Sequence, residues 1–404
     1  MGGYVHPFRC LLSRSFVRTL IELPSFLPLP VSNHTSSRAA RSAAGTLFAT
    51  DRFTESIPFF EAALAINPLY SRSWFILGCA YVKQEDWKDA VRCFRKVVSV
   101  EEEDAEGWNN LASCYLRMGD IGGVENLEKE AKGIELDEED EETKKEEDEL
   151  REEVPAELSS KPRIPHANKL LAHGALKIGL KYGHDNWRMW SNYLLVSIDL
   201  GLNSEAVRAL SRLVEERARH VGEDCVDDEV LDRLVGAVTK GAQPGTEEAK
   251  TEEVNPNEGQ GLLWNLNRLF EVVILPRIST SPRIWRSWAR LLMWQGRIPE
   301  ALDSQVKAYR ASVVNDEEVE RKVERWREAV EETKEIAETM MGLGPKAVDV
   351  EMRTLGEGEK GEWKDWKFQA RSMVRSFMGR TKDAFGDEKE WEVLKEVLDD
   401  LKNA

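Results

Sequence analysis

Apolar residues recur at spacings of three and four along most of the chain, which is the pattern of amphipathic helices. The clearest stretch runs from residue 71 to residue 104, SRSWFILGCAYVKQEDWKDAVRCFRKVVSVEEED. With its first residue counted as place 1, places 4, 7, 8 and 11 hold Trp74, Leu77, Gly78 and Tyr81. Places 20, 24 and 27 hold Ala90, Phe94 and Val97. The pattern predicts two helices joined by a turn, with small residues at Gly78 and Ala90 where the helices approach most closely.

The same pattern occurs on both sides of this stretch, in steps of 34 residues. In the next unit, 105–138, places 4, 7, 8 and 11 hold Trp108, Leu111, Ala112 and Tyr115. The preceding unit, 37–70, has Pro68 at place 32, where proline ends one helix and begins the turn into the next. Because one helix pair cannot bury its own apolar face, the three units predict an array of stacked hairpins.

The 34-residue frame continues, less regularly, in the second half of the chain. Trp190 precedes Ala206 by sixteen residues, and Trp285 precedes Ala301 by sixteen, the separation of places 4 and 20. The helix expected from residue 169 to residue 181 would be the second half of a further unit. Near the C-terminus, three tryptophans are expected to cap the last repeat, since the end of a solenoid otherwise exposes its core. They are Trp363, Trp366 and Trp391.

We therefore predict an all-α protein, a right-handed α–α superhelix with an acidic insertion and a C-terminal helical cap. The expected segments are a disordered leader at 1–36, three units at 37–138, an acidic, Pro-containing linker at 139–167, degenerate repeat helices at 168–240, a flexible insertion at 241–260, repeat helices at 261–315 and C-terminal helices at 316–404.

Charge and cysteine content narrow the function classes. The 73 acidic and 56 basic residues give a net charge of −17, which argues against direct nucleic-acid binding. Thirteen of the acids lie at 135–153, in a solvated segment that repels itself. Five cysteines without paired spacing indicate buried thiols in a reducing compartment. No apolar run approaches the roughly 18 residues of a membrane span, so we expect a cytoplasmic protein, or alternatively a nuclear one.

The start of the chain differs from the rest. Residues 1–36 are basic, acid-poor and interrupted by prolines. This composition is shared with organelle transit peptides, but the early prolines favour a disordered leader or a misassigned start.

Motifs of enzymes are absent from the sequence. It contains no phosphate-binding loop, HExxH, GxSxG or CxxC motif, and its six histidines form no metal-ligand pair four residues apart. We expect no catalytic, cofactor-binding or metal-binding residues, and hence a protein that is not an enzyme.

The repeat unit is identified as tetratricopeptide-like from these places. The junction at 66–75, the segment WNNLASCYLRMGD at 108–120 and DNWRMWSNYLLVSIDLG at 185–201 resemble the tetratricopeptide repeat protein 27 family. The likeness is good over 40–220 and looser in the C-terminal helices. Members of this family have a long helical region before the repeats, where this chain has its leader, so the chain could be a fragment. The resemblance implies a non-enzymatic, intracellular scaffold for protein–protein interaction.

Two alternatives come from other classes. The aromatic NWRMW at 186–190 suggests an RNA-processing scaffold of half-tetratricopeptide repeats, which the acidic composition opposes. Repeated tryptophans in helix pairs also suggest a prenyltransferase α-subunit, but the units lack Asn and Arg at fixed offsets from each Trp.

In a tetratricopeptide array the first helix of each unit lines the concave face, with places 2, 5, 9, 12 and 13 directed into it. The candidate groove residues at these places are Arg38, Arg41, Arg72, Phe75, Lys83, Asn109, Ser113, Arg117, Arg283, Arg286 and Arg290. Their charge predicts a groove for extended acidic or phosphorylated protein segments, with Phe75 taking an apolar side chain of the partner. The tract at 135–153 is predicted to occupy this groove until a partner displaces it.

One known tetratricopeptide ligand is expected not to bind. The carboxylate clamp for chaperone tails needs Lys, Asn, Asn, Lys and Arg at five defined places. Across 37–138 those places hold Arg41, Gly45, Ile76, Glu106 and Asn110, so we predict no chaperone carboxylate-clamp binding.

Overall fold

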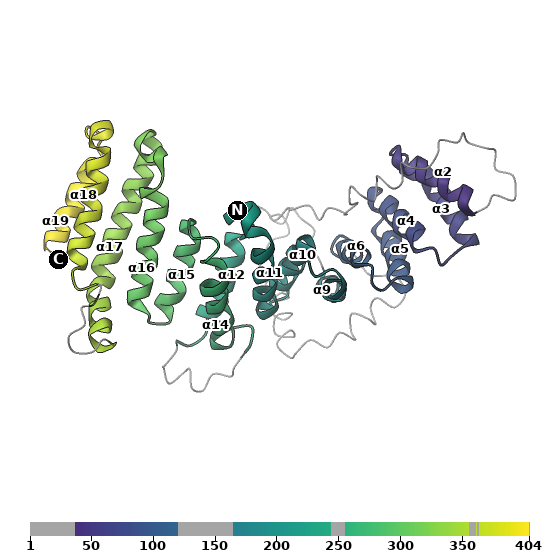
Figure 1. The fold of residues 1–404 in the computed structure, drawn as a ribbon, viewed down its shortest axis with the longest axis horizontal. Coiled ribbons are helices and arrows are strands. Elements are labelled where there is room, and N and C mark those ends of the chain that lie inside the picture. Colours follow the sequence, from purple (N-terminus) through teal and green to yellow (C-terminus); the bar gives the residue numbers. More distant parts are fainter. Residues whose placement is uncertain (1–36, 120–164, 244–254, 355–360, 362, 404) are drawn as a thin grey trace, which may run out of the picture. The chain divides into compact units, whose positions relative to one another are not determined.

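The computed structural model describes residues 37–119, 165–243, 255–354, 361 and 363–403, and every regular element in these ranges is helical (Figure 1). The predicted all-α repeat fold is confirmed. The leader at 1–36, the acidic tract at 135–153 and residues 244–254 of the predicted insertion lie outside the described residues. The chain divides into two compact units, 1–209 and 210–404, which we describe separately.

The first unit consists of helix hairpins. Its helices are α2 (Ser37–Ala49), α3 (Phe53–Ile66), α4 (Ser71–Lys83), α5 (Trp87–Val100), α6 (Ala105–Tyr115), α9 (His166–Tyr182) and α10 (Trp187–Asp199); α11 (Asn203–Val221) begins in it. Helix α2 packs against α3, and α4 packs against α5. Each hairpin also contacts the next, because α3 packs on α4 and α5 packs on α6.

The third hairpin differs from the prediction. Helix α6 packs against α9, so the second helix of this hairpin is at 166–182 instead of within 105–138. Asn168 Nδ2 donates a hydrogen bond to the Met118 carbonyl, which joins the two helices where they face the insertion. Ala172 and Leu176 are buried and are four residues apart, as places 20 and 24 are. Without an insertion, place 20 of this unit would fall at position 124. Ala172 comes 48 residues later, so the frame resumes after an insertion of 48 residues. The insertion therefore lies inside the third unit.

The turn between the two helices of a hairpin has one geometry in four units. Place 15 is left-handed in each, with φ of 59° at Asp51, 62° at Glu85, 75° at Gly201 and 77° at Gly296. The next residue donates its N–H to the carbonyl at place 11, at 2.9 to 3.0 Å in all four. The units beginning at 187 and 282 thus fold like those beginning at 37 and 71.

The tryptophan at place 4 has a role that periodicity did not show. Trp74, Trp108, Trp190 and Trp285 are half-buried instead of fully in the core. Each donates its indole N–H to the carbonyl six residues earlier, at 2.6 to 2.8 Å. This bond fastens the junction between consecutive units. The other repeat positions pack as predicted: Leu77, Gly78, Ala90, Phe94, Leu111, Ala112 and Tyr115 are buried, Tyr81 is half-buried and Pro68 is exposed in its turn.

The second unit is also built of helices, two of which, α17 and α18, are long. Its elements are η1 (Gly222–Cys225), α12 (Asp228–Thr239), α14 (Gly259–Arg268), η2 (Leu269–Ile274), α15 (Pro282–Trp294), α16 (Ile298–Tyr309), η3 (Arg310–Val314), η4 (Glu317–Glu320), α17 (Val323–Thr354), α18 (Trp366–Phe385) and α19 (Trp391–Asn403). Helix α15 packs on both α12 and α16, and α16 packs on α17. Elements η2 and η3 are π-helical.

Tryptophans fill the core at the C-terminal end. Trp363, Trp366 and Trp391 are buried in one apolar cluster that extends from α16 to α19. Trp326, which is completely buried, stacks on Phe385 with ring centroids 5.1 Å apart and on Trp391 at 6.4 Å. The cluster closes the end of the repeat core, as the sequence predicted.

Candidate functional site

The candidate site begins with helix α15, which has two distinct faces. Ile284, Trp288 and Leu292 are buried against the neighbouring helices. Pro282 stands in the first turn, where its missing N–H is not needed. The arginines at 283, 286 and 290, spaced three and four apart, are exposed along the opposite face. We call Arg283, Arg286 and Arg290 the arginine row.

The arginine row lines an open groove of about 440 Å³. Helix α12 contributes Asp228 and Asp232 to this groove, α16 contributes Gln305 and α17 contributes Glu335. The three predicted cations are therefore brought together in one concavity. Sequence analysis missed the acids around them, although Asp228 and Asp232 are spaced to lie on one face of a helix.

Each arginine of the row already has a carboxylate partner. Arg283 pairs with Asp228, and Arg290 Nη1 lies 3.2 Å from Asp232 Oδ1. Both of these pairs are solvent-exposed, with 72% of the Arg283 side chain and 47% of the Arg290 side chain accessible. Exposed pairs of this kind contribute only about 0–1 kcal/mol, so they can exchange with other anions.

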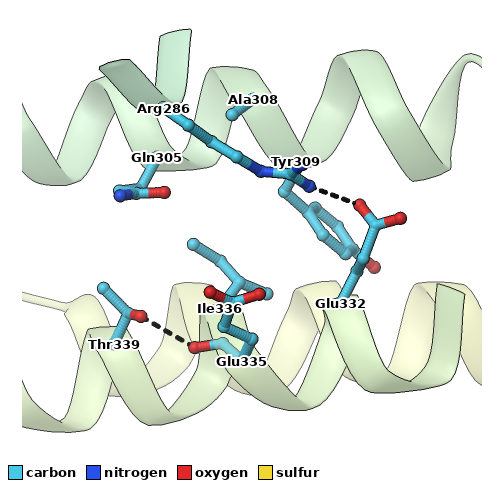
Figure 2. A pocket seen from close by; sticks show the side chains of 8 residues that line it. All are labelled: Arg286, Gln305, Ala308, Tyr309, Glu332, Glu335, Ile336 and Thr339. Atoms are coloured by element: carbon cyan, nitrogen blue, oxygen red, sulfur yellow. Dashed lines mark hydrogen bonds and ion pairs between the residues drawn. The ribbon is translucent and has the colours of Figure 1, made fainter. Parts of the chain in front are cut away.

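Arg286 is held more firmly than its neighbours. Its Nη2 lies 2.7 Å from Glu332 Oε2, and this bond crosses from α15 to α17 (Figure 2). Glu332 also accepts from Arg325 Nη1 at 3.0 Å, and Arg325 is anchored by Asp316 at 2.8 Å. The hydrogen bond from Arg325 lowers the pKa of Asp316. Arg286 is thus fixed in orientation by a carboxylate that is itself held in place.

A polar pair lies beside this contact. Tyr309 and Thr333 share a hydrogen bond of 3.1 Å between their hydroxyls, and burial raises the pKa of Tyr309 to about 12. Gln305 and Ala308 of α16 face Glu335 and Ile336 of α17 across the same pocket (Figure 2). The phenol stays neutral at physiological pH and supplies no general base.

The predicted groove residues of the first unit are in varied surroundings. Arg38 and Lys83 are exposed and Arg72 is half-buried. The Arg41 guanidinium lies over the Tyr70 ring, 4.0 Å from its centroid, and Arg117 lies 5.2 Å from the centroid of Trp87. These two cations stack on aromatic rings of their own chain, which is a favourable cation–π contact.

Three predicted groove residues are buried, and a partner cannot contact their side chains as the structure stands. Phe75 is 3% exposed and packs edge-on against Phe94, with ring centroids 5.5 Å apart. Asn109 is 0% exposed and accepts from Asn192 Nδ2 at 2.9 Å. Ser113 donates to the Asn109 carbonyl at 2.8 Å. The prediction that Phe75 receives a partner's apolar side chain is wrong, because Phe94 already occupies that contact.

A buried polar cluster in the first unit was also missed. Glu205 lies 2.6 Å from His173 Nε2 and accepts from Tyr193 at 2.5 Å and from Lys177 at 2.7 Å. Burial raises the pKa of Glu205, but these hydrogen bonds outweigh it and lower the pKa well below its usual range. The cluster ties α9, α10 and α11 together. Its members are far apart in sequence, so no pattern could have brought them together beforehand.

The described part of the chain offers neither a metal site nor a membrane-spanning helix. In those ranges no group of three or more His, Cys, Asp or Glu side chains could hold a metal ion. No helix in the same ranges is long and apolar enough to cross a membrane. Cys79, Cys93, Cys114 and Cys225 are buried free thiols, and burial raises the pKa of Cys93.

Comparison with known proteins agrees with the repeat geometry. A family model for the tetratricopeptide repeat matches residues 77–122. The chain is 30% identical over 343 residues to a TPR repeat-containing protein of Schizosaccharomyces pombe, covering 85% of this chain and 34% of that protein. It is 27% identical over 358 residues to the Saccharomyces cerevisiae protein named Essential for maintenance of the cell wall protein 1, covering 86% of this chain and 32% of that protein.

A shorter match is to a member of the tetratricopeptide repeat protein 27 family. The chain is 49% identical over 49 residues to the tetratricopeptide repeat protein 27 homolog of Dictyostelium discoideum, covering 12% of this chain and 6% of that protein. The chain thus spans about a third of the length of the two fungal relatives.

Proposed function

We propose, from the premise that this chain is a tetratricopeptide repeat protein resembling the tetratricopeptide repeat protein 27 family, that it acts as a non-enzymatic scaffold for other proteins. The helix hairpins provide a rigid, extended surface, which suits the binding of a linear segment. The observation that supports a specific binding surface is the arginine row, where three guanidinium groups lie in one open groove.

We propose that this groove holds an extended acidic or phosphorylated segment of a partner. A guanidinium has five N–H donors, and one carboxylate uses at most two of them, so each arginine of the row keeps donors for a second anion. The exposed pairs of Arg283 and Arg290 cost little to exchange. Arg286, fixed by Glu332, supplies the orientation.

The acids of the groove favour phosphate over carboxylate as the bound group. Asp228, Asp232, Glu332 and Glu335 already surround the three arginines, so the four acids outnumber the cations by one. A partner carboxylate would replace one carboxylate by another with little net gain. A phosphate group carries about −1.5 to −2 charges and three acceptor oxygens, so it gains more from the same arginines.

The cations predicted to line the groove in the first unit extend this proposal. Arg38, Arg41, Arg72, Lys83 and Arg117 would attract an acidic segment at the first helices of the repeats. The chain's own acidic tract would compete for them.

An oriented peptide library tests the proposed groove. Three libraries with phosphoserine, Glu or Ser fixed at the centre of random sequence are bound to the immobilised full chain, and enriched peptides are then titrated by fluorescence anisotropy. We expect the phosphoserine library to be enriched and the double variant Arg283→Glu with Arg290→Glu to weaken binding by at least about tenfold.

The matched control is Arg321→Glu. Arg321 is also 72% exposed and paired with one acid, Glu317, but it does not line the groove. Equal enrichment of all three libraries, or equal losses in the row variant and in Arg321→Glu, would contradict the proposed groove.

A further inference from the structure

The second unit has another concavity, which shares no lining residue with the groove of the arginine row. It lies between η3 and α18 and has a volume of about 260 Å³. Arg310 and Val314 line it from η3, and Met373, Ser376, Phe377 and Arg380 line it from α18. We call it the η3–α18 groove.

The wall formed by η3 is an interruption of the regular helix. The Asn315 N–H donates to the Arg310 carbonyl at 3.0 Å, five residues back, in place of the usual four. Arg325 donates to the Ser312 carbonyl at 2.8 Å and Arg380 donates to the Val314 carbonyl at 3.1 Å, so the backbone groups of this turn are satisfied from α17 and α18. Single π-turns of this kind are rare in helices and frequent at functional sites.

The charge of this groove contrasts with the charge of the whole chain. Two cations line it, Arg310 from η3 and Arg380 from α18, and no carboxylate is among its lining residues. The chain as a whole has a net charge of −17. Glu320 pairs with Arg380 at 2.8 Å, but no carboxylate in the described ranges lies within ion-pair distance of exposed Arg310. Unlike each arginine of the row, Arg310 has its charge available to a ligand.

The floor of the groove is apolar. Phe377 is 2% exposed and Met373 is half-buried, while Val314 leaves 44% of its surface accessible at the edge. Ser376 presents a hydroxyl beside them. Since ligand pockets for whole small molecules are about 300–1,000 Å³, a groove of this volume suits a single side chain.

We propose that the η3–α18 groove docks an acidic linear segment of a partner protein that carries one large apolar residue among its acids. The apolar side chain packs on Val314 and Met373, and the flanking carboxylates bind Arg310 and Arg380. A peptide with a large apolar side chain fits better than a nucleic acid, because the floor of the groove is apolar. This site shares no lining residue with the groove of the arginine row.

The test uses the full chain and defined fluorescein-labelled peptides at low salt. The first probe is Asp-Glu-Asp-Phe-Asp-Glu-Asp, the second has Ser in place of Phe, and the third is an oligothymidylate of similar length. We expect the Phe peptide to bind at least about tenfold more tightly than the Ser peptide. Arg310→Glu and Val314→Asp should each weaken the Phe peptide by a similar factor, and circular dichroism checks that both variants fold.

Two controls locate the binding. Arg321→Glu removes an exposed cation from the same unit outside both grooves, and Arg283→Glu removes one from the arginine row. Neither should change the affinity for the Phe peptide more than slightly. If Arg283→Glu weakens the peptide and Arg310→Glu does not, the η3–α18 groove is not its site. Equal affinity of the Phe and Ser peptides, or tighter binding of the oligothymidylate, would also overturn the proposal. Should either groove variant fail to fold, Ser376→Glu, at an exposed position that lines the groove, takes its place.

Discussion

Replacing Gly179 by alanine tests the pairing of α6 with α9. A methyl group at this position would lie 2.7 Å from Trp108 Cβ and 3.1 Å from Met189 Sδ. Trp108 Cβ belongs to α6 and is attached directly to its backbone, so it cannot move aside without moving the helix. The added methyl therefore forces the two helices of the third hairpin apart.

The expected cost follows from two opposing terms. Overpacking a well-packed contact costs about 1–3 kcal/mol, while Ala in place of Gly stabilises a helix interior by about 0.5–1 kcal/mol. The net destabilisation of the hairpin is about 0.5–2 kcal/mol. Backbone amide protons of α6 and α9 that exchange through local opening of this hairpin should exchange about 2-fold to 30-fold faster in the variant.

Gly236 provides the matched control. It lies inside α12, and a methyl group there would meet nothing within 4 Å. Gly236→Ala should therefore slow exchange in α12, through helix propensity alone. If Gly179→Ala also slowed exchange in α6 and α9, the close contact with Trp108 would not exist and the pairing described above would be wrong.

Three further predictions concern other elements. Glu85→Gly should stabilise the second hairpin by about 1 kcal/mol in urea unfolding, because the left-handed conformation at place 15 strains any residue with a Cβ. Glu205→Gln should destabilise the first unit at pH 7, and in thermal unfolding the difference from the wild type should vanish as pH falls through the folded-state pKa of Glu205. A depressed carboxylate pKa stabilises above the unfolded value near 4.5 and loses that effect below it. Deleting 135–153 should strengthen partner binding measured by anisotropy, and Arg72→Glu with Lys83→Glu should weaken it, more so at low salt; unchanged affinity in both would exclude the first helices as a binding surface.

The repeat register could be predicted from the sequence because the residue type at each place is set by a local interaction. Trp190 and Trp285, recognised only by their distance from a following alanine, make the same indole hydrogen bond as Trp74. The third unit was predicted wrongly because a fixed frame cannot register an insertion. Ala172 and Leu176, with the spacing of Ala90 and Phe94, were the signal that the frame resumes.

The groove could be predicted only in part. The place number of a residue indicates the side of the helix on which it lies. It placed Arg283, Arg286 and Arg290 on one face of a helix, and in the structure they line one groove. It cannot indicate what packs on that side, so the burial of Phe75 was missed. It also cannot supply partners distant in sequence, such as Asp228, which lies 55 residues from Arg283.

The position of the acidic insertion has a consequence for how the chain can change in length. The facing ends of α6 and α9 are held together by Asn168 and the Met118 carbonyl, so the insertion closes a loop between points that are already adjacent. Closing about 49 residues instead of about three costs only about 2.5 kcal/mol more in chain entropy, and each further doubling costs about 0.6 kcal/mol. The connection between α6 and α9 should therefore tolerate additional residues. A fluorescent or affinity domain inserted there should leave the register of the repeats unchanged.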